Sequence, residues 1–167
     1  QFYMQTSQNM AKYQGLKTAG KDIELKYLGV YVLTVTDNST FKGILNIADT
    51  VTAVNDKTFD SSKDLVDYVN SQQLGDTVKV TYEEDGKVKS AEGKIITLEN
   101  GKNGIGIGLI DRTEVTSDVP IRFSTAGIGG PSAGLMFSLA IYTQIADPGL
   151  RNGRIVAGTG TIDRDGN

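Results

Sequence analysis

A serine stands between glycines in the stretch Gly-Gly-Pro-Ser-Ala-Gly-Leu at residues 129–135, and an apolar run follows it. Its hydroxyl could act as a nucleophile toward a carbonyl carbon if a neighbouring base takes its proton. If Gly130 caps a helix over 131–145, Pro131 occupies the first position, where its missing amide hydrogen costs nothing. Ser132 then lies in the first turn, beside amide groups that can stabilise an oxyanion. The same pattern fits a serine that merely starts a buried helix, so both interpretations stay open.

The residue types that are absent narrow the chemistry further. The chain has no histidine, so the commonest general base is missing. It has no cysteine, which excludes disulfides, thiolate metal sites and thiol nucleophiles. The phrase Gly-Pro-Ser-Ala-Gly also matches the nucleophile elbow of α/β-hydrolases, but residues 23–98 lack the alternating strands and helices of that fold. An esterase of that class would need a histidine beyond Asn167.

Composition predicts a soluble globular chain that binds no nucleic acid. The 167 residues are 38% hydrophobic and 22% charged, enough for one ordinary domain or two small ones. The net charge is −3, and no basic stripe is available to neutralise phosphates. The longest apolar run, 135–146, is too short and too polar to span a bilayer. No metal or cofactor is implied by any motif.

The elements that would position these residues form two predicted units. The first is a half-open β-sandwich with one main helix, and the second is an α+β unit. A composition rich in glycine and asparagine predicts a linker at 99–104. We expect a helix over 7–19 with Ser7 as its cap, a helix that starts at Ser61, and a hairpin turn at Asp85-Gly86. Strands are predicted at 23–36, on both sides of the turn 55–57, at 77–82, 87–97, 104–112, 118–125 and 153–163.

The first unit resembles a PDZ domain in its order of elements and in the phrases GVYVLTV and GDTVKVTYEEDGK. PDZ domains add a peptide as an extra strand to one sheet edge. The resemblance implies that the loop before strand 30–35 holds the peptide carboxylate and that one helix walls the groove. The implied peptide-binding residues are Tyr27, Leu28, Gly29 and Val30 in the loop, and Leu65 and Val69 in the helix.

The second unit resembles the proteolytic domain of the Lon family of serine peptidases, in the phrases GIGGPSAGLMFSLAIY and AGTGTID. The resemblance implies that Ser132 is the nucleophile and Thr159 supports the lysine of a Ser–Lys dyad, in which burial lowers the pKa of the lysine. Its implied oxyanion groups are the backbone of Gly130, Pro131 and Ala133. Many members have an acidic residue where this chain has Gly129.

The position of the dyad lysine bears on activity. In the Lon family it follows the serine, whereas every lysine of this chain precedes Ser132, the last being Lys102. The resemblance therefore implies a base beyond Asn167, and we expect the 167 residues alone to hydrolyse no peptide.

A PDZ unit joined directly to a Lon-type unit resembles the membrane-anchored, ATP-independent Lon-like proteases of Gram-positive bacteria. This implies a helical segment at 1–23, a PDZ-like domain at 24–98 and a Lon-type α+β domain at 99–167. It also implies an endopeptidase without a cofactor that acts on unfolded proteins or peptide C-termini. A membrane anchor would precede Gln1, the peptidase portion would lie on the extracytoplasmic side of the bacterial cell membrane, and copies could self-associate. The alternative function is a non-catalytic PDZ module that only binds peptides.

One further motif is the glycine-rich run Gly104-Ile105-Gly106-Ile107-Gly108. It looks like part of a dinucleotide-binding fingerprint, but it lacks the following helix and the acidic partner that such a site needs. We therefore assign it no nucleotide site.

Overall fold

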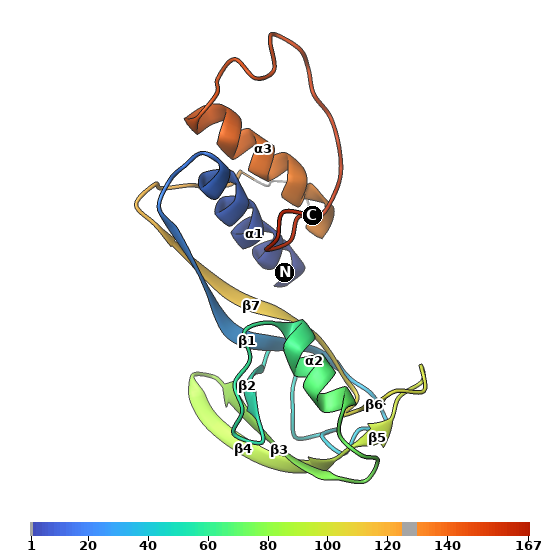
Figure 1. The fold of residues 1–167 in the computed structure, drawn as a ribbon. Helices are drawn as coiled ribbons and strands as arrows, with labels where there is room; N and C mark the ends of the chain where they lie inside the picture. Colours follow the sequence, from blue (N-terminus) through green and yellow to red (C-terminus); the bar gives the residue numbers. More distant parts are fainter. Residues whose placement is uncertain (1, 125–129) are drawn as a thin grey trace. The chain divides into compact units, whose positions relative to one another are not determined.

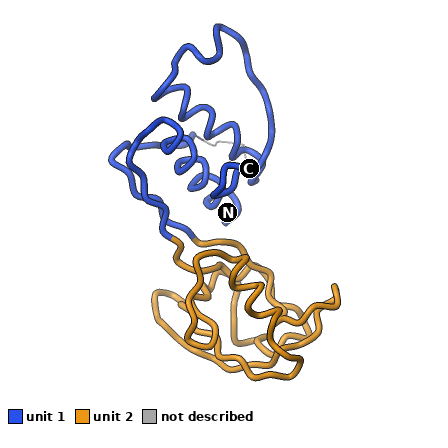
Figure 2. The backbone as a smooth tube through the Cα atoms, viewed as in Figure 1, with its two compact units in different colours: residues 1–26, 113–167 blue, residues 27–112 orange. Residues whose placement is uncertain are grey.

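The computed structural model describes residues 2–124 and 130–167. The chain forms two compact units, Tyr27–Arg112 on the one hand and residues 1–26 with 113–167 on the other (Figure 2). These units divide at 26/27 and 112/113 rather than at the expected 23/24 and 98/99. The reason is that residues 103–112 do not leave the first unit but return to its sheets.

The unit Tyr27–Arg112 is a mixed α/β structure built on a five-stranded sheet in the order β4-β3-β2-β1-β7 (Figure 1). Strand β1 pairs antiparallel with β2, β2 with β3 and β3 with β4, and a second sheet of two strands pairs β5 with β6. The strands are β1 (Ile23–Val35), β2 (Thr50–Val54), β3 (Thr77–Glu84), β4 (Lys87–Lys94), β5 (Ile96–Thr97), β6 (Asn103–Gly104) and β7 (Ile107–Ser117).

Two sequence predictions for this unit are confirmed. Strands β3 and β4 form a hairpin whose turn, Asp85-Gly86, has positive φ at both residues, as a two-residue type I′ turn requires. Helix α2 (Ser62–Asn70) starts directly after Ser61, whose side chain accepts a hydrogen bond from the Asp64 amide at 3.1 Å. The helix buries Leu65 and Val69 against the sheet core, which includes Val30, Val32, Phe41, Leu45, Val51, Val54, Val78 and Val80.

The cap of α2 allows a direct stability test. Ser61→Ala removes the acceptor of an otherwise unpaired amide, so we expect the free energy of unfolding to fall by about 1 kcal/mol. Denaturant unfolding measures this loss. Ser90→Ala, an exposed position on β4, is the matched control and should change stability by less than about 0.5 kcal/mol. Equal losses in the two variants would show that the cap contributes nothing specific.

The other unit is built on two helices, α1 (Phe2–Thr18) and α3 (Gly134–Ile145), which pack against each other. A short 3-10 helix, η1 (Pro131–Ala133), leads into α3, so the helix predicted from Pro131 is confirmed. The first helix begins earlier than predicted. Ser7 is therefore not its cap but a buried internal residue, and its hydroxyl donates to the Pro131 carbonyl at 3.0 Å.

Two strands predicted for this unit are absent from the described residues. Residues 118–124 and 153–163 contain no strand. Pro120 lacks the amide hydrogen that a ladder needs. Only Gly160 in the later segment is joined by backbone hydrogen bonds to another element, as its amide donates to the Ser132 carbonyl and its carbonyl accepts from Leu135. Without a paired strand beside it, the β-rich composition of 153–163 does not produce a sheet.

Candidate functional site

A groove lies between helix α2 and the start of strand β7. Its pocket has a volume of about 120 Å³. The lining is almost entirely apolar or glycine, with Asn70 as its one polar side chain. The lining residues are Leu65, Val66, Val69, Asn70, Leu98, Gly104, Ile105, Gly106, Ile107 and Leu109. Such a pocket fits a single aliphatic side chain.

Strand β7 forms one edge of the five-stranded sheet, because β1 is its only neighbour among the described strands. The Thr36 amide donates to the Gly106 carbonyl at 2.8 Å, and Gly108 lies against Thr34, so β7 runs antiparallel to β1. Alternate residues of an antiparallel strand turn their backbone groups to opposite sides. Since Gly106 faces β1, the backbone groups of Ile107 and Leu109 face the open edge, where another strand can pair.

The loop before β7 presents two amide groups in the same direction. The Ile105 carbonyl accepts from the Ser39 hydroxyl at 2.6 Å, and the Gly106 carbonyl accepts from Thr36. Each N–H of a trans peptide points opposite to its carbonyl. The amides of Gly106 and Ile107 therefore both point away from Ser39 and Thr36. The positive φ of Gly106, 72°, produces this arrangement of successive amides, which is a typical anion-binding nest.

The structure brings only part of the predicted peptide site together. Leu65 and Val69 line the groove, as expected. The predicted loop 27–30 does not line it, and β1, to which these residues belong, lies between β2 and β7 with no open edge for a peptide. Val30 is fully buried in the core, and none of Tyr27, Leu28, Gly29 and Val30 lines the pocket.

Gly29 shows why that loop looked suitable. Its φ is 127°, and a Cβ atom there would overlap the Val51 carbonyl. The glycine is therefore needed for the close approach of β1 to β2, not for a ligand. A segment with successive amides that point in one direction, Gly104-Ile105-Gly106-Ile107, lies instead before β7, and the sequence interpretation gave it no role in peptide binding. Its signal was present as alternating glycine and isoleucine immediately before a strand.

At the other end of the groove, Asp111 of β7 accepts a hydrogen bond from the first amide of α2, that of Ser62, at 2.9 Å. The Tyr27 hydroxyl is buried nearby and has no hydrogen-bond partner among the residues that the structure describes. Burial, and then the charges of Asp111, Asp64 and Asp60, raise the pKa of Tyr27 well above its usual range. This phenol is therefore neutral at physiological pH.

The predicted nucleophile lies in the helical unit. Ser132 is an exposed residue of η1, and Gly130 precedes it with φ 94°. The Thr159 hydroxyl donates to the Ser132 carbonyl at 3.3 Å, and the Gly160 amide donates to the same oxygen at 2.7 Å. The structure thus brings Ser132 and Thr159 together, but through the serine carbonyl rather than through its hydroxyl.

In the described part of the chain, the environment of Ser132 contains the helix start but no base that bonds to its hydroxyl. Pro131 and Ala133 complete η1, so the amides of this turn are those that a helix leaves unpaired. Within 2–124 and 130–167, the Ser132 hydroxyl donates no hydrogen bond, and no lysine bonds to it. Gly129, where many Lon proteases carry an acid, lies outside the described residues.

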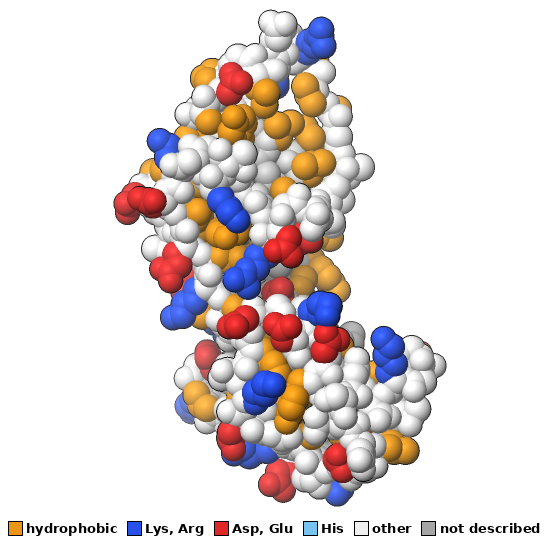
Figure 3. Space-filling view, in the orientation of Figure 1, with side chains coloured by type: hydrophobic (Ala, Val, Ile, Leu, Met, Phe, Trp, Pro, Cys, Tyr) orange, Lys and Arg blue, Asp and Glu red, His pale blue; other side chains and the backbone are white. Residues whose placement is uncertain are grey.

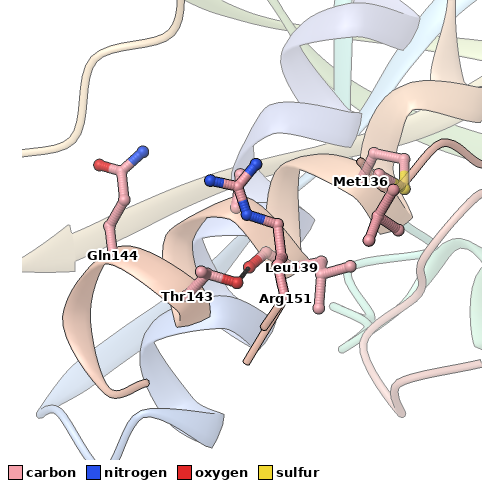
Figure 4. A pocket seen from close by; sticks show the side chains of 7 residues that line it. Met136, Leu139, Thr143, Gln144 and Arg151 are labelled. Atoms are coloured by element: carbon pink, nitrogen blue, oxygen red, sulfur yellow. Dashed lines mark hydrogen bonds between the residues drawn. The ribbon is translucent and has the colours of Figure 1, made fainter. Parts of the chain in front are cut away.

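A separate pocket opens on α3, as Figure 4 shows. Its labelled residues are Met136, Leu139, Thr143, Gln144 and Arg151, with Ala140 and Val156 completing the lining. The Thr143 hydroxyl is not available to a ligand as a donor, because it donates to the Leu139 carbonyl at 2.8 Å. Ser132 and Thr159 do not line this pocket.

The surface near α3 is notably apolar, as the space-filling view shows (Figure 3). Ile155 is 99% exposed, and three further aliphatic side chains are exposed by 44–45%, namely Leu135, Leu150 and Val156.

No helix in the described part of the chain has the length and apolar character needed to cross a membrane. The described residues also contain no group of three or more side chains suited to hold a metal ion.

Comparison with known proteins identifies the sheet-containing part. A family model described as PDZ domain matches residues 4–95. None of the curated protein sequences compared with the chain matches it.

Solved structures give matches at 32–39% identity. The PDZ domain of an SdrC-like protein from Listeria monocytogenes is 35% identical, with 52% of this chain and 93% of that one covered and a TM-score of 0.49. The PDZ domain of an SdrC-like protein from Listeria innocua is 38% identical, with coverage of 48% and 92% and a TM-score of 0.47. A protein from Geobacillus thermodenitrificans is 32% identical, with coverage of 48% and 94% and a TM-score of 0.43.

Proposed function

We propose, from the premise that this chain belongs to the PDZ domain family, that the groove between α2 and β7 binds the C-terminal end of a polypeptide. The observation that carries the proposal is the pair of amides of Gly106 and Ile107, which point together away from β1 beside an apolar pocket. The two amides suit an anion, and the pocket suits an aliphatic side chain. The last residue of a peptide chain carries both groups, a carboxylate and a side chain, on one Cα atom.

The mode of binding follows from the strand edge. The carboxylate accepts hydrogen bonds from the two amides, and the last side chain enters the pocket lined by Leu65, Val66 and Val69. The preceding residues pair with the open edge of β7. Because the carboxylate lies at the start of β7, the peptide runs antiparallel to this strand.

The experiment that tests this function compares two peptides that differ only at their end. We expect a peptide ending in Val-COOH to bind at least 10-fold more tightly than the same peptide with a C-terminal amide, measured by fluorescence anisotropy or calorimetry. The amide cannot supply the negative charge that the paired amides favour. Equal affinities would mean that the loop does not recognise a carboxylate, and the proposed function would be wrong.

A second candidate function is peptide hydrolysis with Ser132 as the nucleophile. Its support is the exposed position of Ser132 at a helix start, after Gly130 and beside Thr159. In this mechanism the Ser132 oxygen attacks the peptide carbonyl carbon while its proton passes to a base. The amine leaves with that proton, and water then hydrolyses the acyl-enzyme. The resemblance to Lon peptidases supplies a lysine as the base.

Hydrolysis is tested with an unfolded protein as substrate, by following its cleavage on a gel. We expect a form extended beyond Asn167 to cut, whereas its Ser132→Ala variant and the 167 residues alone do not. Equal cleavage by the Ser132→Ala variant would leave Ser132 a helix-start residue. If only the extended form with Ser132 cuts, the groove of the intact protein would deliver substrate chains to Ser132. The proposed location is the extracytoplasmic side of a bacterial membrane.

A further inference from the structure

We infer that the groove selects polypeptide C-termini that carry a lysine or arginine at the third or fifth residue from the end, upstream of an apolar last residue. This inference rests on the proposed function of the groove and adds the class of sequence that it prefers. The carrying observation is a group of carboxylates where α2 begins beside β7.

Three aspartates meet at that end of the groove. Asp111 projects from β7 and accepts from the Ser62 amide, Asp64 lies in the first turn of α2, and Asp60 precedes the helix. All three lie near enough to the Tyr27 hydroxyl to act on it electrostatically. They therefore form one negatively charged region around the start of α2, which we call the acidic end.

The two cations that neighbour these aspartates in sequence serve other partners. Lys63 is paired with Asp67 one turn further along α2. Arg112 donates to the Thr50 hydroxyl at 2.8 Å and lies over the Tyr31 ring. Since adjacent residues of a strand project to opposite faces, Arg112 does not share the side of Asp111. The acidic end thus favours a positive charge on the ligand.

The spacing of β7 determines which peptide residue meets the acidic end. In an antiparallel pairing, the last peptide residue lies opposite Ile107, the third from the end opposite Leu109, and the fifth opposite Asp111. The three side chains point the same way because side chains alternate along a strand. The last of them enters the pocket beside α2, so those at the third and fifth positions also point toward α2. The fourth points away.

The test uses three peptides that end in Val-COOH and differ in the placement of two charged residues. One has lysines third and fifth from the end, one has lysines fourth and sixth, and one has glutamates third and fifth. We expect the first to bind roughly 10-fold more tightly than the second and tighter still than the third at low salt. The advantage should shrink at high salt, since screening weakens charge pairs.

Asp111→Asn removes the negative charge but keeps the structural hydrogen bond, because the asparagine oxygen can still accept from the Ser62 amide. We expect this variant to lose most of the preference for the first peptide. Asp85→Asn, in the exposed hairpin turn, is the control and should keep it. If the first and second peptides bind equally while a C-terminal amide still weakens binding at least 10-fold, this inference is overturned and the proposed function stands. If the amide has no effect either, both are overturned.

Discussion

Gly106→Ala is expected to weaken the binding of a C-terminal peptide roughly 100-fold. A Cβ atom at this position would overlap the Thr36 hydroxyl, which with the Thr36 amide holds the Gly106 carbonyl. The backbone also has φ 72°, which disfavours alanine. Both effects rotate the peptide units that present the amides of Gly106 and Ile107. The loss of two hydrogen bonds to a charged group, at about 1.5 kcal/mol each, corresponds to this factor.

The control for Gly106→Ala is Gly101→Ala. Gly101 has a similar φ of 78°, but nothing lies within 4 Å of a Cβ atom built on it. Both variants therefore pay a backbone cost of about 1 kcal/mol, and only the first disturbs the loop. Calorimetry with the free-acid peptide measures the binding, and thermal unfolding shows that both proteins remain folded. Unchanged affinity in a folded Gly106→Ala protein would exclude this loop as the carboxylate site.

Sequence reasoning succeeded where the information is local. The start of α2 was predicted because Ser61 and Asp64 have the spacing of a cap, and the turn of the β3–β4 hairpin because Asp85-Gly86 suits a tight turn. Leu65 and Val69 were predicted to wall a groove because their spacing places them on one helical face. Each of these features is determined by residues within a few positions of one another.

The loop that we propose for the carboxylate differs from the one predicted from sequence, because its recognition depends on pairing between distant strands. Gly29 and Gly106 both stand just before apolar strand residues, so the local patterns are alike. What distinguishes them is that β1 has neighbours on both sides, whereas β7 ends the sheet. Strand order is set by contacts between residues far apart in the sequence, here Thr36 with Gly106. No propensity at either glycine contains that information.

For the turn that contains Ser132, too, the local features could be predicted from sequence and the tertiary ones could not. The helix start at Pro131 follows from local preferences and is confirmed. The Ser132 carbonyl accepts hydrogen bonds from the Thr159 hydroxyl and the Gly160 amide. The resemblance implied a different role for Thr159, as support for a lysine. A base is a matter of tertiary position and burial, so the sequence around Ser132 could neither supply it nor exclude it.

Val66→Glu is expected to weaken peptide binding roughly 30-fold without unfolding the protein. Val66 lines the pocket, yet its side chain is 37% exposed, so the glutamate can reach solvent in the free protein. Glutamate also forms helix better than valine. In the complex, the new carboxylate would lie beside the apolar last side chain and near the peptide carboxylate. Losing solvation there at about 2 kcal/mol corresponds to this factor.

The matched control is Val88→Glu, which makes the same chemical change on β4, at the opposite edge of the sheet from β7. Val88 is 75% exposed and lines no part of the groove. The affinity of the Val88→Glu variant for the peptide should therefore stay within a factor of two of the wild type. Anisotropy titrations of both variants with one labelled peptide give the comparison. Equal weakening in the two would point to a general effect of added negative charge. A loss confined to Val66→Glu would locate the last peptide side chain against α2, where the antiparallel pairing with β7 requires it to be.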